Sequence, residues 1–183
     1  MPLPLFTVGH SNRTIEAFID TLRADEIELV VDVRRLPGSR RYPQFDEDAL
    51  RSSLAAEGID LARNAALTGR RPVSHDVPFE TNALWRNRSF HNYADHALSD
   101  EFRGGLAELR RAGRERRTSV MCSEAVWWRC HRRIIADHLL AHGEQVIHLM
   151  DAGRSQRADL TPGAVSDGAG GLVYPAPAVS EDS

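Results

Sequence analysis

A short and nearly continuous apolar run at residues 28–33 constrains the fold of this chain more than any other segment. Leu29, Val30, Val31 and Val33 make up most of it, so apolar and polar residues do not alternate along the run. A strand without a polar face is typical of a parallel sheet that is covered on both sides. Parallel strands need crossover connections, which are usually helices. The run therefore predicts a chain in which strands alternate with helices.

The rest of the chain follows this alternation. Further strands are predicted at residues 3–8, 59–62, 118–122 and 145–150. Helices are predicted at residues 14–24, 46–57, 99–112 and 128–142, with Thr14 and Ser99 capping the first and the third. This order predicts an α/β fold, with a mostly parallel sheet flanked by helices in a single domain of Rossmann-like three-layer arrangement.

The predicted domain occupies residues 1–150 of the 183-residue chain. An irregular insertion interrupts it at about residues 64–98, where turn residues, aromatic residues and arginines are mixed. Residues 151–183 are rich in Gly, Pro, Ala and Ser, so we expect a loosely ordered C-terminal tail.

The chain contains no lysine, and all 23 of its basic residues are arginine. Schiff-base chemistry and pyridoxal phosphate attachment need a lysine amine, and a P-loop nucleotide site needs a lysine after its glycine-rich turn. None of these can be built here. Any anion must be held by guanidinium groups, by backbone N–H groups or by a metal ion.

The sequence also bounds the compartment. Only two cysteines are present, which is too few for a disulfide framework. No stretch has the roughly 18 to 20 apolar residues of a membrane helix, and the first six residues do not form a secretory signal. We expect a cytoplasmic protein with reduced thiols and no membrane partner.

Residues with useful chemistry follow the predicted strands. In parallel sheets, ligands bind beyond the carboxyl ends of the strands. The residues at these positions are His10 and Ser11 after the first strand, Asp32 and Arg34 at the second, and Cys122 and Glu124 at the fourth. This convergence predicts a site at that edge of the sheet.

Two of these pairs leave alternatives open. His10 and Ser11 can bind an anion through backbone N–H groups or move a proton, or they can simply satisfy a turn. Asp32 can orient Arg34 as a fixed fork for phosphate or carboxylate, or the two can form a structural ion pair.

The cysteine segment allows three interpretations. Cys122 can be a nucleophilic or redox residue, with Glu124 or His131 as its proton partner. A divalent metal ion can instead be held by a set of ligands drawn from Cys122, Cys130, His131 and His10, although Cys-x7-Cys-His is not a standard zinc spacing. The third interpretation is that each cysteine is a small buried hydrophobic residue.

Arginine doublets are interleaved with aromatic residues along the chain, for example Arg34–Arg35, Arg40–Arg41 and Arg70–Arg71. Bases can stack on aromatic side chains while arginines hold phosphates. The net charge of −3 is not that of a general nucleic-acid binder. The loop arginines near the strand ends are therefore the better candidates for binding phosphate.

Several motifs resemble the domain of unknown function family numbered 488. They are Thr-Val-Gly-His-Ser at residues 7–11, Asp-Val-Arg at 32–34 with Pro37 and Ser39 after it, the segments 67–71 and 93–109, Cys122-x-Glu124, and Cys130-His131-Arg132. The resemblance spans roughly residues 5–150, with Ala125 to Arg129 in place of the usual small spacer. It implies a compact α/β domain and supplies no settled activity.

These observations favour an enzyme that acts on a phosphorylated small molecule or a nucleic-acid-derived substrate by hydrolysis or transfer. The predicted catalytic residues are Cys122, Glu124, His10 and Asp32, and the predicted anion-binding residues are Ser11, Arg34, His131 and Arg132. The alternatives are a non-enzymatic nucleic-acid-binding module and a Cys/His metal-binding protein.

Overall fold

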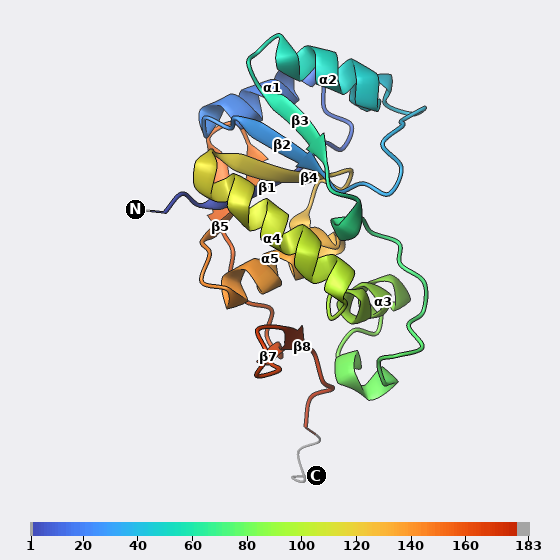
Figure 1. The fold of residues 1–183 in the computed structure, drawn as a ribbon. Helices are drawn as coiled ribbons and strands as arrows, with labels where there is room; N and C mark the ends of the chain where they lie inside the picture. The colour runs from blue at the N-terminus through green and yellow to red at the C-terminus, as the bar shows by residue number, and fades with distance from the viewer. Residues whose placement is uncertain (1, 179–183) are drawn as a thin grey trace.

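The computed structural model describes residues 2–178 and contains a six-stranded sheet with the strand order β3-β2-β4-β1-β5-β6 (Figure 1). The strands are β1 (Leu5–Gly9), β2 (Leu29–Asp32), β3 (Asp60–Arg63), β4 (Thr118–Cys122), β5 (Val146–Asp151) and β6 (Arg154–Arg157). All neighbours from β3 to β5 are parallel, and β6 is antiparallel to β5. The predicted α/β fold with a mostly parallel sheet is confirmed.

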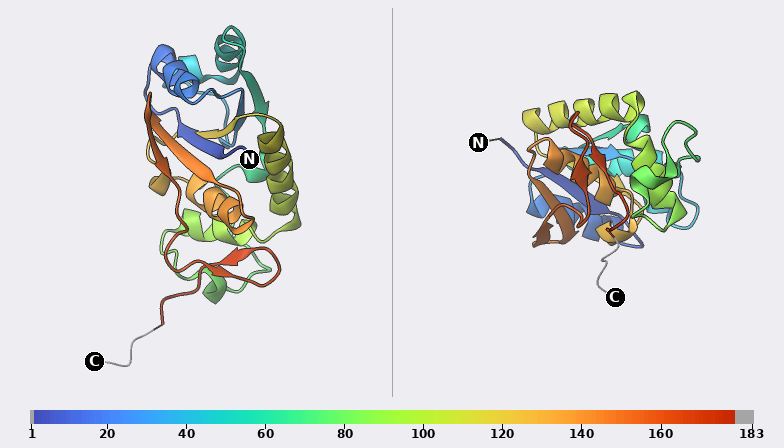
Figure 2. Two further views of the ribbon diagram at one scale, coloured as in Figure 1. Left: turned by 90° about the vertical axis from the view of Figure 1, so that its left-hand side faces the viewer. Right: turned by 90° about the horizontal axis from the view of Figure 1, so that it is seen from below.

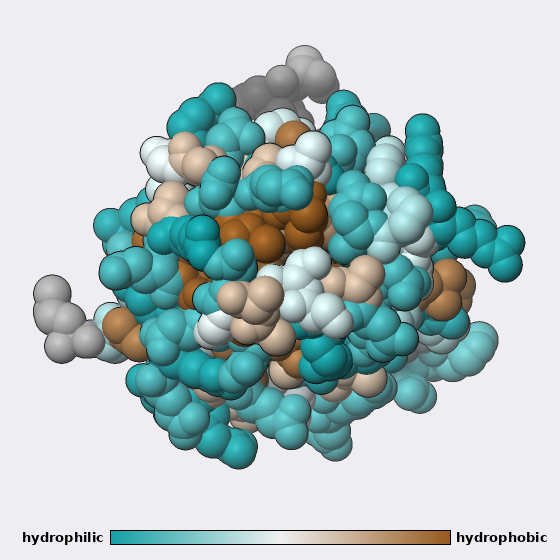
Figure 3. Space-filling model, turned by 90° about the horizontal axis from the view of Figure 1, so that it is seen from above, coloured by the Kyte–Doolittle hydropathy of each residue, from teal (hydrophilic) through white to brown (hydrophobic). Residues whose placement is uncertain are grey.

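Helices cover both faces of the sheet. They are α1 (Ile15–Ala24), α2 (Glu47–Ala55), α3 (Arg88–His96), α4 (Asp100–Glu115) and α5 (Arg132–Ala141). One core lies between the sheet and α1 and α2, and the other lies between the sheet and α3, α4 and α5. Figure 2 shows α4 running along one face of the sheet. Viewed from above, the end carrying α1 and α2 is mostly hydrophilic, with apolar residues visible in a central hollow (Figure 3).

Strand β2 explains why the apolar run has no polar face. Val30 packs into the core under α1 and α2, whereas Val31 and Val33 pack into the opposite core. Successive side chains of a strand point to opposite faces, so a strand covered by helices on both sides buries all of them. The predicted N-caps are also confirmed, because the hydroxyls of Thr14 and Ser99 accept hydrogen bonds from the first turns of α1 and α4.

The connections place a crevice beside β1 and β4. These strands are neighbours, but the chain leaves β1 toward α1 on one face and leaves β4 toward α5 on the other. Neighbouring parallel strands whose connections diverge in this way leave a crevice at their carboxyl ends. Pairing positions Gly9 opposite Cys122, so the loops after the two strands begin side by side.

Two predictions made from the sequence need correction. The last helix does not begin at residue 128: a short 3-10 turn, η4 (Trp127–Arg129), comes first, and α5 begins at Arg132. The segment expected to be a loose tail supplies β6 and the hairpin of β7 (Val165–Ser166) and β8 (Leu172–Val173), and it packs against the domain as far as the buried Tyr174. Residues 179–183 of the expected tail lie outside the described residues.

The folded tail is held by a buried tyrosine. The Tyr174 hydroxyl donates to Asp137 Oδ2 on α5 at 2.8 Å, and Tyr174 N–H donates to Asn82 Oδ1 of the insertion at 3.0 Å. The composition of the segment did not reveal this anchor, since a single aromatic residue decides its position.

No helix in residues 2–178 is both long enough and apolar enough to span a bilayer.

The hydroxyl of Tyr174 provides a test of the tail. We expect Tyr174→Phe to lower the free energy of unfolding by about 1.5 to 3 kcal/mol, because a buried carboxylate loses a donor. Urea unfolding measures this loss. Tyr42→Phe is the control, since we find no hydrogen bond to the Tyr42 hydroxyl within residues 2–178. Equal stability of the wild type and Tyr174→Phe would contradict the anchored tail.

Candidate functional site

A pocket of about 530 Å³ opens at the carboxyl ends of the parallel strands. Six of the residues singled out in the sequence line it, namely His10, Arg34, Cys122, Glu124, Cys130 and His131. The loops after β1 and β4 are held together by the N–H groups of His10 and Ser11, which donate to the carbonyls of Cys122 and Ser123 at 3.0 Å each. These N–H groups are therefore used within the protein, contrary to the expectation that this turn binds an anion through them.

Glycine is required where the two loops meet. A Cβ on Gly9 would overlap the carbonyl of Glu124 and would lie 2.9 Å from the Arg132 side chain. The absence of a side chain at Gly9 thus lets the loop after β4 pass directly over the end of β1.

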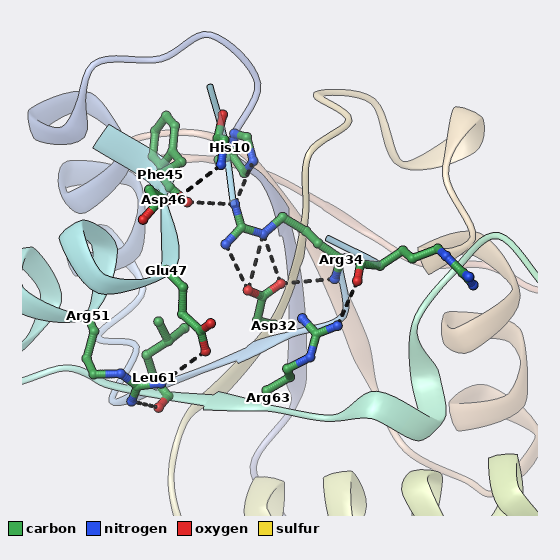
Figure 4. Close-up of polar contacts among 11 residues, drawn as sticks. His10, Asp32, Arg34, Phe45, Asp46, Glu47, Arg51, Leu61 and Arg63 are labelled. Atoms are coloured by element: carbon green, nitrogen blue, oxygen red, sulfur yellow. Dashed lines mark hydrogen bonds and ion pairs between the residues drawn. The ribbon is translucent and has the colours of Figure 1, made fainter. Parts of the chain in front are cut away.

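Arg34 forms one wall of the pocket through a buried ion pair (Figure 4). Its Nε and Nη2 donate to the Asp32 carboxylate at 3.0 and 2.8 Å, and its Nη1 donates to the carbonyl of Phe45 at 2.7 Å. Each nitrogen of the guanidinium therefore has a partner in the protein. This geometry corresponds to the structural ion pair that the sequence left open, and it does not leave Arg34 as a free fork for an anion. Asp32 is buried behind it and does not line the pocket.

His10 is held by contacts on both ring nitrogens and on one ring face. The contacts assign a proton to Nδ1, which donates to the carbonyl of Ser11 at 2.9 Å, while Nε2 lies 3.4 Å from Arg34 Nη1 and the ring stacks on Phe45. Burial, with the Arg34 charge adding to it, lowers the pKa of His10 to about 4. Both nitrogens are engaged, so His10 is poorly placed to move a proton. Ser11 has a left-handed backbone, with φ of 50°, and lies outside the pocket lining.

Arg132 lies beneath the pocket floor and is 1% exposed. It was expected to bind an anion from solvent, but it does not line the pocket. Its Nη1 donates to the hydroxyl of Thr7 at 3.1 Å, and its Nη2 donates to the carbonyl of Glu124 at 2.7 Å. Within residues 2–178 its Nε has no partner, and no carboxylate lies within ion-pair distance. A buried cation needs a compensating negative charge, which must come from another ionisable group.

The two cysteines supply that group. Their sulfur atoms lie 2.7 Å apart, and the backbone N–H of Arg132, at the N-terminus of α5, lies 3.5 Å from Cys130 Sγ. Burial raises the pKa of Cys130, but its hydrogen bond with Cys122 and the charge of Arg132 outweigh burial and bring the pKa down to about 7. Burial and the hydrogen bond to Cys130 raise the pKa of Cys122. The lower of the two thiol pKa values is therefore that of Cys130, whereas the sequence singled out Cys122 as the candidate nucleophile.

His131 lies beside this thiol. Its Nδ1 lies 3.5 Å from Cys130 Sγ, and its Nε2 donates to the carbonyl of Val33 at 3.2 Å. Burial lowers the pKa of His131, so the ring is neutral and Nδ1 can accept a proton. A nucleophile, a base within reach and a third group that orients the base form the arrangement that activates a thiol. Gly69 fits against this ring, where a Cβ would come within 2.8 Å of Nδ1.

The rim of the pocket carries positive charge. Arg35, Arg70 and Arg129 line it with exposed side chains, and none of them has an ion-pair partner in the described part of the chain. Glu124 is the one acidic residue of the lining, and its carboxylate is at the exposed rim while its carbonyl faces Arg132. Arg35 and Arg70 belong to arginine doublets noted in the sequence. Nothing in the sequence showed that these two arginines, and not those of the other doublets, lie at the rim.

No group of three or more His, Cys, Asp or Glu side chains within residues 2–178 is arranged to hold a metal ion.

The comparisons agree with the resemblance seen in the sequence. The family model described as Domain of unknown function DUF488 matches residues 14–139. The chain belongs to this family. No curated protein and no solved structure matches the chain. The DUF488 match includes the Asp32–Arg34 pair and the whole segment from Cys122 to Arg132, whereas β1 with Gly9 and His10 lies before it.

The pairing of Arg132 with Cys130 in this DUF488 protein can be tested by alkylation with iodoacetamide. We expect the rate to be half-maximal near pH 7, because the thiolate reacts and its fraction rises through the pKa of about 7. Replacing the charge in Arg132→Gln should move this midpoint upward by about 1 to 3 pH units.

Arg132→Lys keeps a positive charge and should leave the midpoint near that of the wild type, and Arg133→Gln controls for loss of a neighbouring arginine. Cys130→Ser should react slowly, because the remaining Cys122 thiol is buried. An unchanged midpoint in Arg132→Gln would show that Arg132 does not stabilise the thiolate.

Proposed function

We propose that this protein is an enzyme that uses the Cys130 thiolate as a nucleophile on a phosphorylated or nucleic-acid-derived substrate. The observation that supports this most strongly is the Cys130–His131 pair at the floor of an arginine-rimmed pocket. A buried cation stabilises the thiolate, a neutral imidazole accepts its proton, and the substrate side is open to solvent.

The proposed reaction begins from the Cys130 thiolate; where the thiol is still protonated, His131 Nδ1 first takes its proton. The thiolate then forms a bond to the electrophilic centre of the substrate. The bond to the leaving group breaks, and its electron pair and a proton go to the leaving group. Glu124 at the rim is the exposed carboxylate of the pocket and is assigned to proton transfer with the leaving group or with the water or acceptor that completes hydrolysis or transfer.

The substrate class is inferred from the rim. Three arginines without carboxylate partners in the described residues favour an anion, and phosphate groups match the guanidinium fork well. Tyr42 and Phe90 are half-buried in the same lining and offer ring faces to a base. We assign the protein to the cytoplasm or another reducing compartment, because its two neighbouring thiols are free.

The second candidate is a nucleic-acid-binding module without activity. It is favoured by aromatic residues next to arginines, such as Trp128, which is 44% exposed, and the half-buried Tyr42, whose ring lies 5.6 Å from the Arg41 guanidinium. The net charge of −3 favours a local phosphate site over a broad binding surface.

A substrate panel tests the enzymatic proposal. It comprises p-nitrophenyl phosphate, nucleoside 5′-monophosphates and 5′-diphosphates, and 5′-phosphorylated DNA and RNA oligonucleotides, with products followed by chromatography. We expect turnover of at least one class and a loss of about 10³- to 10⁴-fold in kcat in Cys130→Ser, because the nucleophile is removed. His131→Gln should lower kcat by about 10²- to 10⁴-fold.

Arg103→Gln, an exposed change on α4 outside the pocket, should leave kcat unchanged. Full activity of Cys130→Ser on a substrate that the wild type turns over would refute the nucleophilic role. No turnover across the panel, combined with oligonucleotide binding that Cys130→Ser retains, would favour the binding module.

Salt dependence tests the role of the rim arginines. We expect binding of a 5′-phosphorylated single-stranded oligonucleotide, followed by fluorescence anisotropy, to weaken as salt rises, with a log–log slope of about −0.7 for each phosphate neutralised. Arg70→Gln should make the slope less steep by about one phosphate contact. Arg103→Gln serves again as the control, and an equal slope in Arg70→Gln and wild type would exclude Arg70 from the phosphate site.

A further inference from the structure

Cys122 is a second thiol at the pocket floor that the proposed nucleophilic reaction does not use. We propose that Cys122 and Cys130 are a redox site, in which a hydroperoxide oxidises Cys130 and Cys122 closes a reversible intramolecular disulfide. The disulfide would consume the nucleophile, so its effect on activity rests on the proposed function. The oxidation itself does not depend on that function.

The position of the two sulfur atoms carries this inference. They lie 2.7 Å apart in the reduced protein, whereas a disulfide bond is about 2.05 Å long. Closing the bond therefore needs a movement of about 0.7 Å. Cys122 ends β4 and Cys130 precedes α5, and the connection between them is half-buried or exposed. This connection can absorb the shift without a change in the sheet or the helix.

The two thiols are unequal in a way that fits successive steps. Cys130 is next to the Arg132 charge and to the Arg132 N–H at the α5 N-terminus, both of which favour its thiolate, and His131 Nδ1 lies 3.5 Å from its sulfur. Cys122 is buried and stays protonated, with its sulfur directed at Cys130. Both residues line the pocket, so a small oxidant reaches the thiolate from the substrate side. The first residue is the attacking thiolate and the second is the resolving thiol.

The chemistry balances with a hydroperoxide as the oxidant. The Cys130 thiolate attacks the terminal peroxide oxygen, the O–O bond breaks, and the departing oxygen takes a proton, which leaves a sulfenic acid and water or an alcohol. Cys122 then attacks the sulfenic sulfur, its proton goes to the departing hydroxyl, and the products are the disulfide and a second water. Two thiols are oxidised and one peroxide is reduced.

Arg132 also makes the disulfide easy to reduce. In the reduced protein both thiols raise the pKa of the buried guanidinium, and a disulfide removes the negative charge that Cys130 can carry beside it. Interactions that stabilise the reduced thiolate favour reduction of the disulfide. The pair therefore behaves as a reversible switch and not as a structural crosslink.

Peptide mapping tests the proposal on the full chain. The reduced protein, in EDTA, is treated with equimolar hydrogen peroxide, alkylated and digested with trypsin. Cleavage after Arg117, Arg129 and Arg132 separates the two cysteines, so a disulfide joins peptide 118–129 to peptide 130–132. We expect this crosslinked pair in the wild type, lighter by two hydrogen atoms than its parts, and its disappearance after dithiothreitol.

Variants define the two roles. Cys122→Ser should stop at a sulfenic or sulfinic acid on Cys130, whereas Cys130→Ser should keep an unoxidised Cys122. Ser123→Ala, in the same loop, should form the crosslink as the wild type does. Circular dichroism checks that each variant is folded, and the wild-type map decides the central point without any variant. Two free thiols in the wild type after treatment, a sulfinic acid at Cys130 without crosslink, or a disulfide between two molecules would overturn the proposal.

The outcome is separable from that of the proposed function. Mass spectrometry reads the crosslink without substrate, so a disulfide can form in a protein that turns over none of the panel. Conversely, turnover that depends on Cys130 but is unchanged by equimolar peroxide would support the proposed enzymatic function and contradict the proposed redox site.

Discussion

The burial of Arg132 sets the chemistry of this molecule. A guanidinium that is 1% exposed and has no carboxylate partner in the described residues is expensive unless another group supplies negative charge. Thr7 and the Glu124 carbonyl supply hydrogen-bond acceptors but no net charge. The two thiols lie beside it, both raise the pKa of Arg132, and the charge of Arg132 lowers the pKa of Cys130. The low pKa of Cys130 is thus linked to how the fold compensates one buried cation.

The architecture brings these groups together from distant parts of the chain. Thr7 lies on β1, Cys122 ends β4, and Arg132 begins α5. These residues therefore meet at the point where the connections after β1 and β4 leave toward opposite faces of the sheet. The Arg132 charge also influences His148. The Thr7 hydroxyl lies 2.6 Å from His148 Nδ1, and the His148 ring stacks on Trp127. Burial and the Arg132 charge lower the pKa of His148 to about 3, which keeps that ring neutral. In the Asp32–Arg34 pair the two charges compensate each other. Its hydrogen bonds fix the Arg34 side chain at the wall of the pocket.

The sequence predicted the order of strands and helices because hydrophobic periodicity and helix caps are local properties. It also indicated which edge of the sheet collects polar residues, since that follows from the direction of parallel strands. It could not show that the donors of Arg34 and Arg132 are used within the protein, because a guanidinium looks the same in a sequence whether its donors face solvent or the protein. The anchoring of the tail could not be predicted for a similar reason. It depends on the hydrogen bond from Tyr174 to Asp137, which lies on α5 and is distant in the sequence.

By itself, the sequence determined an α/β domain of the DUF488 family and a set of chemistry-bearing residues at the strand ends. The tertiary structure decided which residue has which role. It buried both Arg34 and Arg132, placed a carboxylate beside the first and two thiols beside the second, and left the rim to Arg35, Arg70 and Arg129. The reason is physical: the charge state of a group depends on its burial and on neighbours supplied by other elements, and neither is written in the local sequence.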